Sequence, residues 1–431
     1  MSEILLITVL LAALFFFLGS GIWVGASLLA CAIVGMEIFT SRPTGDSMAV
    51  TIWGSQSSWT LTALPMFIWM GEILFRTKLS EILFRGLTPW MHRLPGGLLH
   101  VNVAGSAIFA AISGSSAATC ATVGKMSIPE LRKRQYPENM IIGTLAGAGT
   151  LGLLIPPSIS LIIYGVTVNE SIAKLFIAGI LPGICLALMF MGYVAIWGLV
   201  QGHVTTETLR FTMMERLRAL VDLVPVLLLI VAVIGAIYTG YATATEAAVL
   251  GVLGSFGLSA LQKSLTRETF IASLFGAVRT SAMIAFILAG SSFLSLAMGF
   301  TGLPRALAEA ISGFNLTPLS LIACLTVFYI ILGCFLDGIS SIVLTMAVIE
   351  PMVRAAGFDM IWFGVYLMIV VEMAQITPPI GFNLFVLQGM TGHDMGFISR
   401  AAFPMFLIMC VAVALLVWFP DVATFLPSAV Q

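Results

Sequence analysis

Long apolar runs separated by short polar breaks follow one another along the whole chain, and few charges fall inside any run. A run of about 20 apolar residues is long enough to cross the hydrocarbon core of a bilayer as a helix. The 431 residues leave room for roughly a dozen membrane segments. The pattern therefore predicts an all-α integral membrane protein. The first two runs, within 1–39, follow Glu3 rather than a basic segment, so we expect two retained helices and no signal peptide.

Two apolar runs contain adjacent prolines, LLIPPSIS at 153–160 and QITPPIGF at 375–382. A proline inside a helix removes an N–H group, so a carbonyl one turn earlier loses its partner. In hydrocarbon this is tolerated where the freed groups face protein or a water-filled cavity. Such carbonyls, at the C-terminal end of a half-helix, suit a cation such as Na+. The candidates run from Gly152 to Ile155 and from Ala374 to Thr377. A kink used only for packing is the alternative.

The chain repeats this arrangement at a fixed spacing. SGSSAATCATVGKMSIPEL (113–131) precedes the first proline pair, and LDGISSIVLTMAVIEPMV (336–353) precedes the second. The two proline pairs are separated by the same number of positions as Pro129 and Pro351, which we expect to close helices. We call this spacing the repeat offset. Two halves with a polar cluster and a broken helix each are typical of transporters built from repeats.

Positive charges indicate how the halves face. If 76–95 and 131–138 are cytoplasmic, the stretch between them is a re-entrant hairpin with its tip at 113–116. If successive segments continue to cross from one side to the other, the positive charges show a clear positive-inside bias. The second hairpin, about 318–354, then opens from the opposite face of the membrane. The repeat is therefore inverted. Fourteen cations then lie inside, four outside (Arg42, Lys174, Arg305 and Arg354) and Lys125 in the hairpin; the inside set is Arg76, Lys78, Arg85, Arg93, Arg132, Lys133, Arg134, Arg210, Arg216, Arg218, Lys263, Arg267, Arg279 and Arg400.

The first hairpin tip offers hydroxyl groups and a helix start. In SGSSAAT, glycine lets the backbone turn, and the free N–H groups of the following helix favour an anion such as a carboxylate. Close helix packing by small residues is the alternative.

The second tip, LDGISS at 336–341, adds an ionisable residue. Asp337 is a functional candidate because a charge is costly at membrane depth. It can cap the second half-helix, coordinate Na+ or take up a proton, and the sequence leaves these roles open. Ser340 and Ser341 mirror the serines of the first tip. Glu372, before the second break, is placed to orient its carbonyls, and Asn383 after it is a candidate ligand.

Composition narrows the class of function. The chain is 59% hydrophobic and 9% charged, whereas soluble domains are about 25% charged. A net charge of −1 argues against nucleic acid as a partner. The six cysteines form no CxxC pair, the four histidines are scattered, and no GxxxxGK[ST] loop occurs. We therefore expect no metal centre, no built-in ATPase and no enzyme.

The segments SGSSAAT…IPEL, GTLGLLIPPSI and TPPIGFNLFV together resemble the large membrane subunit (DctM type) of tripartite ATP-independent periplasmic (TRAP) transporters, over essentially the whole chain. The resemblance implies an inverted-repeat elevator-type carrier in the bacterial inner membrane, similar in fold to divalent-anion/sodium symporters and without a cofactor. Na+ would drive uptake of a C4-dicarboxylate, sugar acid or similar carboxylate. The implied partners are a small four-helix subunit (DctQ type), expected as a separate polypeptide, and a periplasmic substrate-binding protein (DctP type).

The resemblance also implies two Na+ sites with the substrate between the two tips. Members often carry Gly where Ala374 stands; because the ligand there would be a backbone carbonyl, alanine can also serve. Some members carry Asp where Thr119 stands, which argues against a side-chain role for Thr119. The first Na+ site would comprise Ser113, Gly114, Ser116, Gly152 and Ile155, the second Asp337, Gly338, Ala374 and Thr377, and the substrate site Ser115, Ser116, Pro157, Ser158, Ser340, Ser341, Pro379 and Asn383.

These expectations divide the chain at residue 202. The first repeat, 1–202, would hold scaffold helices to about 76, an interfacial arm helix 77–96, hairpin 97–131, broken helix 137–170 and helix 172–201. The second repeat, 203–431, would hold scaffold helices 222–298, arm helix 299–316, hairpin 317–355, broken helix 360–391 and last helix 396–420. Two other functions stay open: a self-sufficient Na+/carboxylate symporter without a binding protein, and a channel or electron-transfer subunit, against which the lack of haem-pair histidines and cysteine clusters counts.

Overall fold

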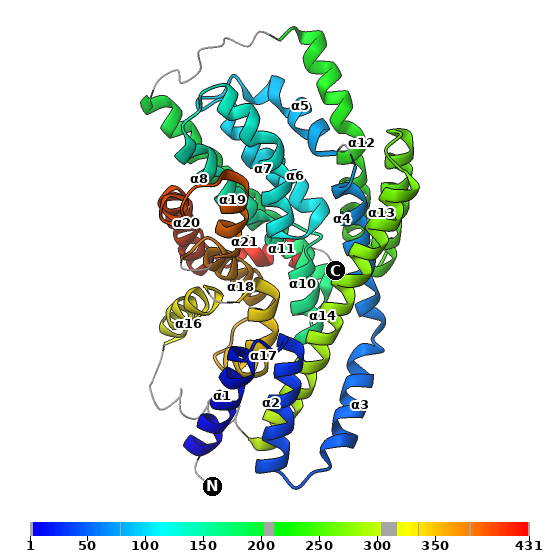
Figure 1. Ribbon diagram of the computed structural model, residues 1–431, viewed down its shortest axis with the longest axis vertical. Coiled ribbons are helices and arrows are strands. Elements are labelled where there is room, and N and C mark those ends of the chain that lie inside the picture. The colour runs from blue at the N-terminus through cyan, green and yellow to red at the C-terminus, as the bar shows by residue number, and fades with distance from the viewer. Residues whose placement is uncertain are drawn as a thin grey trace.

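The computed structural model describes residues 3–77, 79–201, 211–302, 317–334, 336–378 and 381–429. Within them every regular element is a helix. Figure 1 shows an elongated molecule, with α1, α2 and α3 at its lower end and α12 and α13 along the side opposite α16, α18 and α20. The all-helical class predicted from the apolar runs is confirmed.

The first repeat begins with scaffold helices and continues into a hairpin and a broken helix. The two apolar runs of 1–39 form α1 and α2. The hairpin consists of α6 and α7, and the broken helix of α8, α9 and α10. The elements are α1 (Glu3–Gly19), α2 (Val24–Phe39), α3 (Thr44–Gln56), η1 (Trp59–Thr62), α4 (Ala63–Phe75), α5 (Leu79–Met91), α6 (Leu99–Ser113), α7 (Ser116–Lys133), α8 (Glu138–Gly149), α9 (Leu151–Leu154), α10 (Ile159–Thr167) and α11 (Ile172–Gln201).

The second repeat follows the same order. Its hairpin consists of α16 and α17, and its broken helix of α18 and α19. The predicted arm helix 299–316 lies mostly outside the described residues, and α14 occupies its first three positions. The elements are α12 (Met213–Tyr238), α13 (Ala244–Leu261), α14 (Arg267–Thr301), α16 (Pro318–Gly333), α17 (Gly338–Ala355), α18 (Met360–Gln375), α19 (Phe382–Thr391), α20 (Met395–Trp418) and α21 (Asp421–Ala429).

The second helices of the two hairpins correspond residue for residue. Both α7 and α17 have 18 residues, and the repeat offset separates their first residues and also their last residues. Their N-caps, Ser115 and Asp337, are separated by the same offset. The prediction that Pro129 and Pro351 close these helices is wrong, since both prolines lie inside them. Each helix continues for another turn because neighbouring helices can compensate for the missing hydrogen bond.

The helices differ in whether they are long enough to span a bilayer. Among the described residues, six helices have sufficient length and apolar character, or eight if each of two bent pairs is one span. Several others are shorter, such as Leu99–Ser113 and Met360–Gln375 in a hairpin and a broken helix. A helix of 15 residues is about 22 Å long, against about 30 Å of hydrocarbon. The expected dozen membrane segments included these hairpin arms and half-helices, which need not span the bilayer one by one.

The broken helices form the centre and the scaffold helices the periphery. Residues 362–375 of α18 are all buried, whereas α12 exposes large apolar side chains such as Leu228 and Val231. Exposed apolar side chains along a long helix are typical of contact with lipid or a partner helix. Packing at the centre crosses between repeats, because α7 contacts both α9 and α19, and α17 contacts both α18 and α10.

Candidate functional site

The first hairpin tip is a tight turn closed by hydroxyl groups. Gly114 ends α6 with φ of 57°, in the left-handed region that glycine adopts without strain. Ser115 caps α7 by accepting a hydrogen bond from the Ala118 N–H at 3.4 Å. The hydroxyls of Ser113 and Thr119 are 2.9 Å apart, and Thr119 also donates to the Ser115 carbonyl at 2.8 Å. Thr119 thus holds the shape of the turn.

The first break frees two carbonyls. Pro156 and Pro157 carry no N–H, so the carbonyls of Gly152 and Leu153 lack their usual partners four residues on. The Ser158 hydroxyl donates to the Leu153 carbonyl at 2.5 Å and caps α10 through the Leu161 N–H. Ser158, predicted to contact substrate, therefore uses its hydroxyl on the backbone of the break.

The first tip packs directly on the first break. A Cβ atom at Gly152 would lie 2.6 Å from the Ser115 carbonyl group and from the Ser116 nitrogen. A Cβ atom at Gly114 would lie 2.7 Å from the Pro157 oxygen, and the Ile159 N–H donates to the Gly114 carbonyl at 3.4 Å. The structure thus brings together the residues predicted for the first Na+ site, with Ile155 as the extended residue that ends α9.

The second tip is capped by its carboxylate. Asp337 accepts hydrogen bonds from the N–H groups of Ile339 at 3.1 Å and Ser340 at 3.2 Å, and its side chain is exposed. Of the three roles left open by the sequence, the structure shows capping. Ser340 and Ser341 are buried on the first turn of α17.

The second hairpin tip contacts the second break, just as the first tip contacts the first break. The Cys334 thiol donates to the Pro378 carbonyl at 3.3 Å, and the Gln375 amide donates to the Leu336 carbonyl at 3.5 Å. At the break the Ala374 carbonyl accepts from the Thr377 N–H at 3.1 Å, and the Thr377 hydroxyl donates to Met373. Pro379, predicted to contact substrate, lies outside the described residues.

Gly333 makes room for the methyl group of Ala374. A Cβ atom at Gly333 would lie too close to the Cβ of Ala374 for any real contact. The absence of a side chain at Gly333 therefore lets α16 approach the end of α18.

A buried polar contact joins the two repeats. Ser116, at the start of α7, donates to a carboxylate oxygen of Glu372 at 2.9 Å and accepts from the Asn383 amide at 2.6 Å. Glu372 belongs to α18 and Asn383 to α19, so both halves of the second broken helix contact the first tip. On the other side, a Cβ at Gly338 would lie 3.0 Å from the side chains of Leu153 and Val371. Both tips therefore converge on the two breaks.

Glu372 is the functional candidate that sequence reasoning underestimated. It was expected only to orient nearby carbonyls, and it instead bonds to the opposite hairpin. The available signal was an ionisable residue in an apolar helix one turn before a break. Within the described residues no group of three or more His, Cys, Asp or Glu could hold a metal ion. The oxygens near the tips come mainly from hydroxyls, amides and carbonyls.

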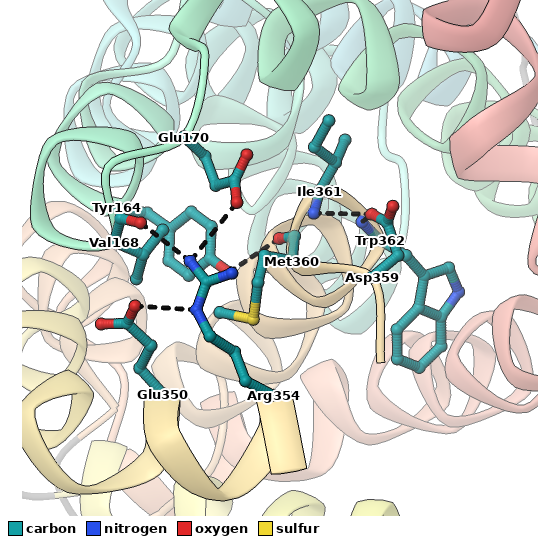
Figure 2. Close-up of polar contacts among 9 residues, drawn as sticks. All are labelled: Tyr164, Val168, Glu170, Glu350, Arg354, Asp359, Met360, Ile361 and Trp362. Atoms are coloured by element: carbon teal, nitrogen blue, oxygen red, sulfur yellow. Dashed lines mark hydrogen bonds and ion pairs between the residues drawn. The ribbon is translucent and has the colours of Figure 1, made fainter. Parts of the chain in front are cut away.

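A second cross-repeat contact fastens the far end of α17. Figure 2 shows Arg354 donating to the Val168 carbonyl at 3.0 Å and to the carboxylates of Glu350 at 3.0 Å and Glu170 at 3.4 Å. Beside it, the Tyr164 hydroxyl donates to the carbonyl of Met360 at 2.7 Å. Val168 ends α10, so the guanidinium occupies the negative end of that helix.

The counterpart of Arg354 in the first repeat makes a similar contact. Arg132, one repeat offset earlier, pairs with Glu138 at 2.6 Å, and Glu138 also contacts His393 beyond the end of α19. At the outer ends, the second hairpin therefore contacts the broken helix of the first repeat directly, whereas the first hairpin is linked to the end of α19 through Glu138 of its own repeat.

Replacing Arg354 with glutamine should lower the stability of this end of the molecule. The side chain is 45% exposed, so we expect a loss of about 1 kcal/mol in the free energy of unfolding. Thermal unfolding of the purified protein in detergent would measure it. Arg400→Gln is the control, since Arg400 is exposed and donates to Gly396 within its own helix. Equal melting temperatures for both variants would mean that the Arg354 contacts add nothing.

Comparison with known proteins identifies the family that shares this architecture. The family model described as "Tripartite ATP-independent periplasmic transporter, DctM component" matches residues 11–422. The C4-dicarboxylate TRAP transporter large permease protein of Pseudomonas aeruginosa is 30% identical over 89% of each chain. The sialic acid TRAP transporter large permease protein of Vibrio cholerae is 29% identical over 95% of each chain.

A solved structure with little sequence similarity shares the fold. The Alcanivorax borkumensis YdaH transporter superposes with a TM-score of 0.65 over 88% of this chain and 87% of its own, at 10% identity. At this identity the likeness concerns the fold alone.

Proposed function

The chain belongs to the DctM component family of tripartite ATP-independent periplasmic transporters, and from this premise we propose that it imports an organic acid across the bacterial inner membrane by Na+ symport. It is a multi-pass membrane protein related to transport permeases rather than to enzymes. The observation that carries the proposal is the meeting of two inverted hairpin tips with two broken helices at one place.

The residues present at this place fit the chemistry of the proposal. The starts of α7 and α17 present the positive ends of two helix dipoles, which favour the carboxylate of a substrate between the tips. The Gly152 carbonyl, freed at the first break, and the Ala374 carbonyl, which keeps a lone pair beside its bond from Thr377, would present negative partial charge to Na+. Substrate and ions would then bind in a body of hairpins and broken helices, which moves against the scaffold as an elevator.

The partners and the substrate class of this proposal follow from family membership. The relatives named above carry a C4-dicarboxylate in one case and sialic acid in the other. We infer a carboxylate substrate of this kind, delivered by a DctP-type periplasmic binding protein. A DctQ-type membrane subunit would cover the apolar surface of scaffold helices such as α12.

Uptake into proteoliposomes tests the proposal. The vesicles would contain this chain with its small membrane partner, and the binding protein would be added outside with or without an inward Na+ gradient. We expect uptake that requires both the gradient and the binding protein, and that falls at least tenfold in Ser116→Ala. Uptake without the binding protein would favour a self-sufficient symporter. Uptake that ignores Na+ would contradict the coupling.

A further inference from the structure

Glu372 places a carboxyl group in the protein interior, and the described residues provide no cation beside it. Its side chain is 1% exposed, and none of the ion pairs among the described residues includes it. One carboxylate oxygen accepts from Ser116, whereas Oε1 has no hydrogen-bond partner within the described residues. The backbone of Leu153 at the first break lies within hydrogen-bonding reach of the carboxyl, and the Cys120 thiol of α7 lies nearby; neither group is a cation. An ionised carboxylate is strongly unfavourable in such a place unless a cation compensates it.

Asn383 offers a second unused oxygen at the same point. It is fully buried and donates its Nδ2 to Ser116, while its Oδ1 has no partner in the described part of the chain. Both unpartnered oxygens thus belong to side chains that meet at one hydroxyl group. Two buried oxygens without a partner on one hydrogen-bonded cluster leave room for a further polar group there, such as an ion or an ordered water.

We propose that Glu372, Asn383 and Ser116 form a cation site between the first hairpin tip and the second broken helix. One carboxylate with neutral amide and hydroxyl groups balances a single positive charge, and oxygen ligands suit a hard ion, so the ligand is a monovalent cation such as Na+. The inference rests on the proposed Na+ coupling and adds a site to it. A cation held there would attach the tip of α7 to both α18 and α19, so closure of the first tip would depend on it.

No equivalent cation site is expected at the corresponding positions of the other repeat. The repeat offset relates Ser116, Glu372 and Asn383 to Gly338, Thr150 and Leu161 respectively. These three counterparts offer one hydroxyl and no carboxylate or amide side chain. The cation site therefore occurs once per chain, and it shares Ser116 with the first of the two Na+ sites expected at the breaks.

Glu372→Gln is the variant that tests the inference. Its amide oxygen still accepts from Ser116, but the charge is gone. Thermal unfolding of the purified protein, without substrate, would be followed while NaCl replaces choline chloride at constant ionic strength. We expect the half-saturating Na+ concentration to rise at least tenfold. We also expect an equal or higher melting temperature without Na+, because an uncompensated charge has been removed. Glu72→Gln is the control, since Glu72 pairs with Arg76 on scaffold helix α4.

The outcomes separate this inference from the proposed function. A wild-type protein that Na+ does not stabilise would contradict the coupling itself. Na+ stabilisation that is unchanged in Glu372→Gln would overturn the cation site, and would mean that the carboxyl group is neutral through a bound proton. If Glu372→Gln does not fold, Asn383→Ala provides the same test, because it removes one oxygen and keeps the charge. An unchanged Na+ requirement in that variant would equally overturn the site.

Discussion

Na+-driven uptake should be lost, by at least tenfold, when Gly152 is replaced by alanine. The new Cβ would lie 2.6 Å from backbone atoms of Ser115 and Ser116, and a backbone cannot move aside as a flexible side chain does. The first tip would have to withdraw from the first break, which separates the groups proposed to hold Na+. Overpacking of this kind costs about 1–3 kcal/mol. Proteoliposome uptake and thermal unfolding would measure the two effects.

The repeat supplies the control for Gly152→Ala. Ala374 occupies the equivalent position in the second break, one repeat offset later, and already carries a methyl group. Ala374→Gly should retain uptake and lose about 1 kcal/mol of stability, through the greater backbone freedom of glycine. Wild-type uptake by Gly152→Ala would show that the first tip does not need its close contact with the break.

Asp337→Asn and Asp337→Ala should differ in thermal stability but change the Na+ dependence of uptake in the same way. Asparagine caps a helix as well as aspartate does, so Asp337→Asn should unfold at the wild-type temperature. Asp337→Ala leaves the N–H groups of Ile339 and Ser340 without their cap and should lose about 1 kcal/mol. Both lose a negative charge beside the second proposed Na+ site. The Na+ concentration for half-maximal uptake should therefore rise at least tenfold in both.

The comparison of the two variants separates the roles that the sequence left open for Asp337. An asparagine variant with the wild-type Na+ requirement would reduce Asp337 to a helix cap. Asp359→Asn is a suitable control, since Asp359 caps α18 in the same way through Ile361 and Trp362. Uptake by this variant should stay at the wild-type level, because Asp359 lies before the first residue of α18, at the end of the helix opposite the break (Figure 2).

Much of the fold could be predicted because it depends on motifs and spacings that can be recognised in the sequence. The repeat offset between the proline pairs also relates α7 to α17. Two adjacent prolines remove two consecutive N–H groups, and glycine–serine clusters permit a turn, so these motifs act mainly on the local backbone. For the same reason both breaks and both tips occur where the sequence placed them.

The rest depends on packing that a single sequence does not reveal. Pro129 and Pro351 have the same local chemistry as the proline pairs, yet their helices continue past them. The bond between Ser116 and Glu372 joins residues 256 positions apart and has no counterpart in the repeat. Hence the internal symmetry that predicted the fold gave no information about this contact.

The close contact of Gly333 with Ala374 has a consequence for the history of the family. The space between α16 and the end of α18 holds one methyl group and not two. A descendant that acquired alanine in the broken helix needed glycine in the hairpin, whereas a lineage with glycine in the broken helix was free to enlarge the hairpin residue. These two positions should therefore vary together across homologous permeases. Their combined side-chain volume should be conserved even where the two residue types are not.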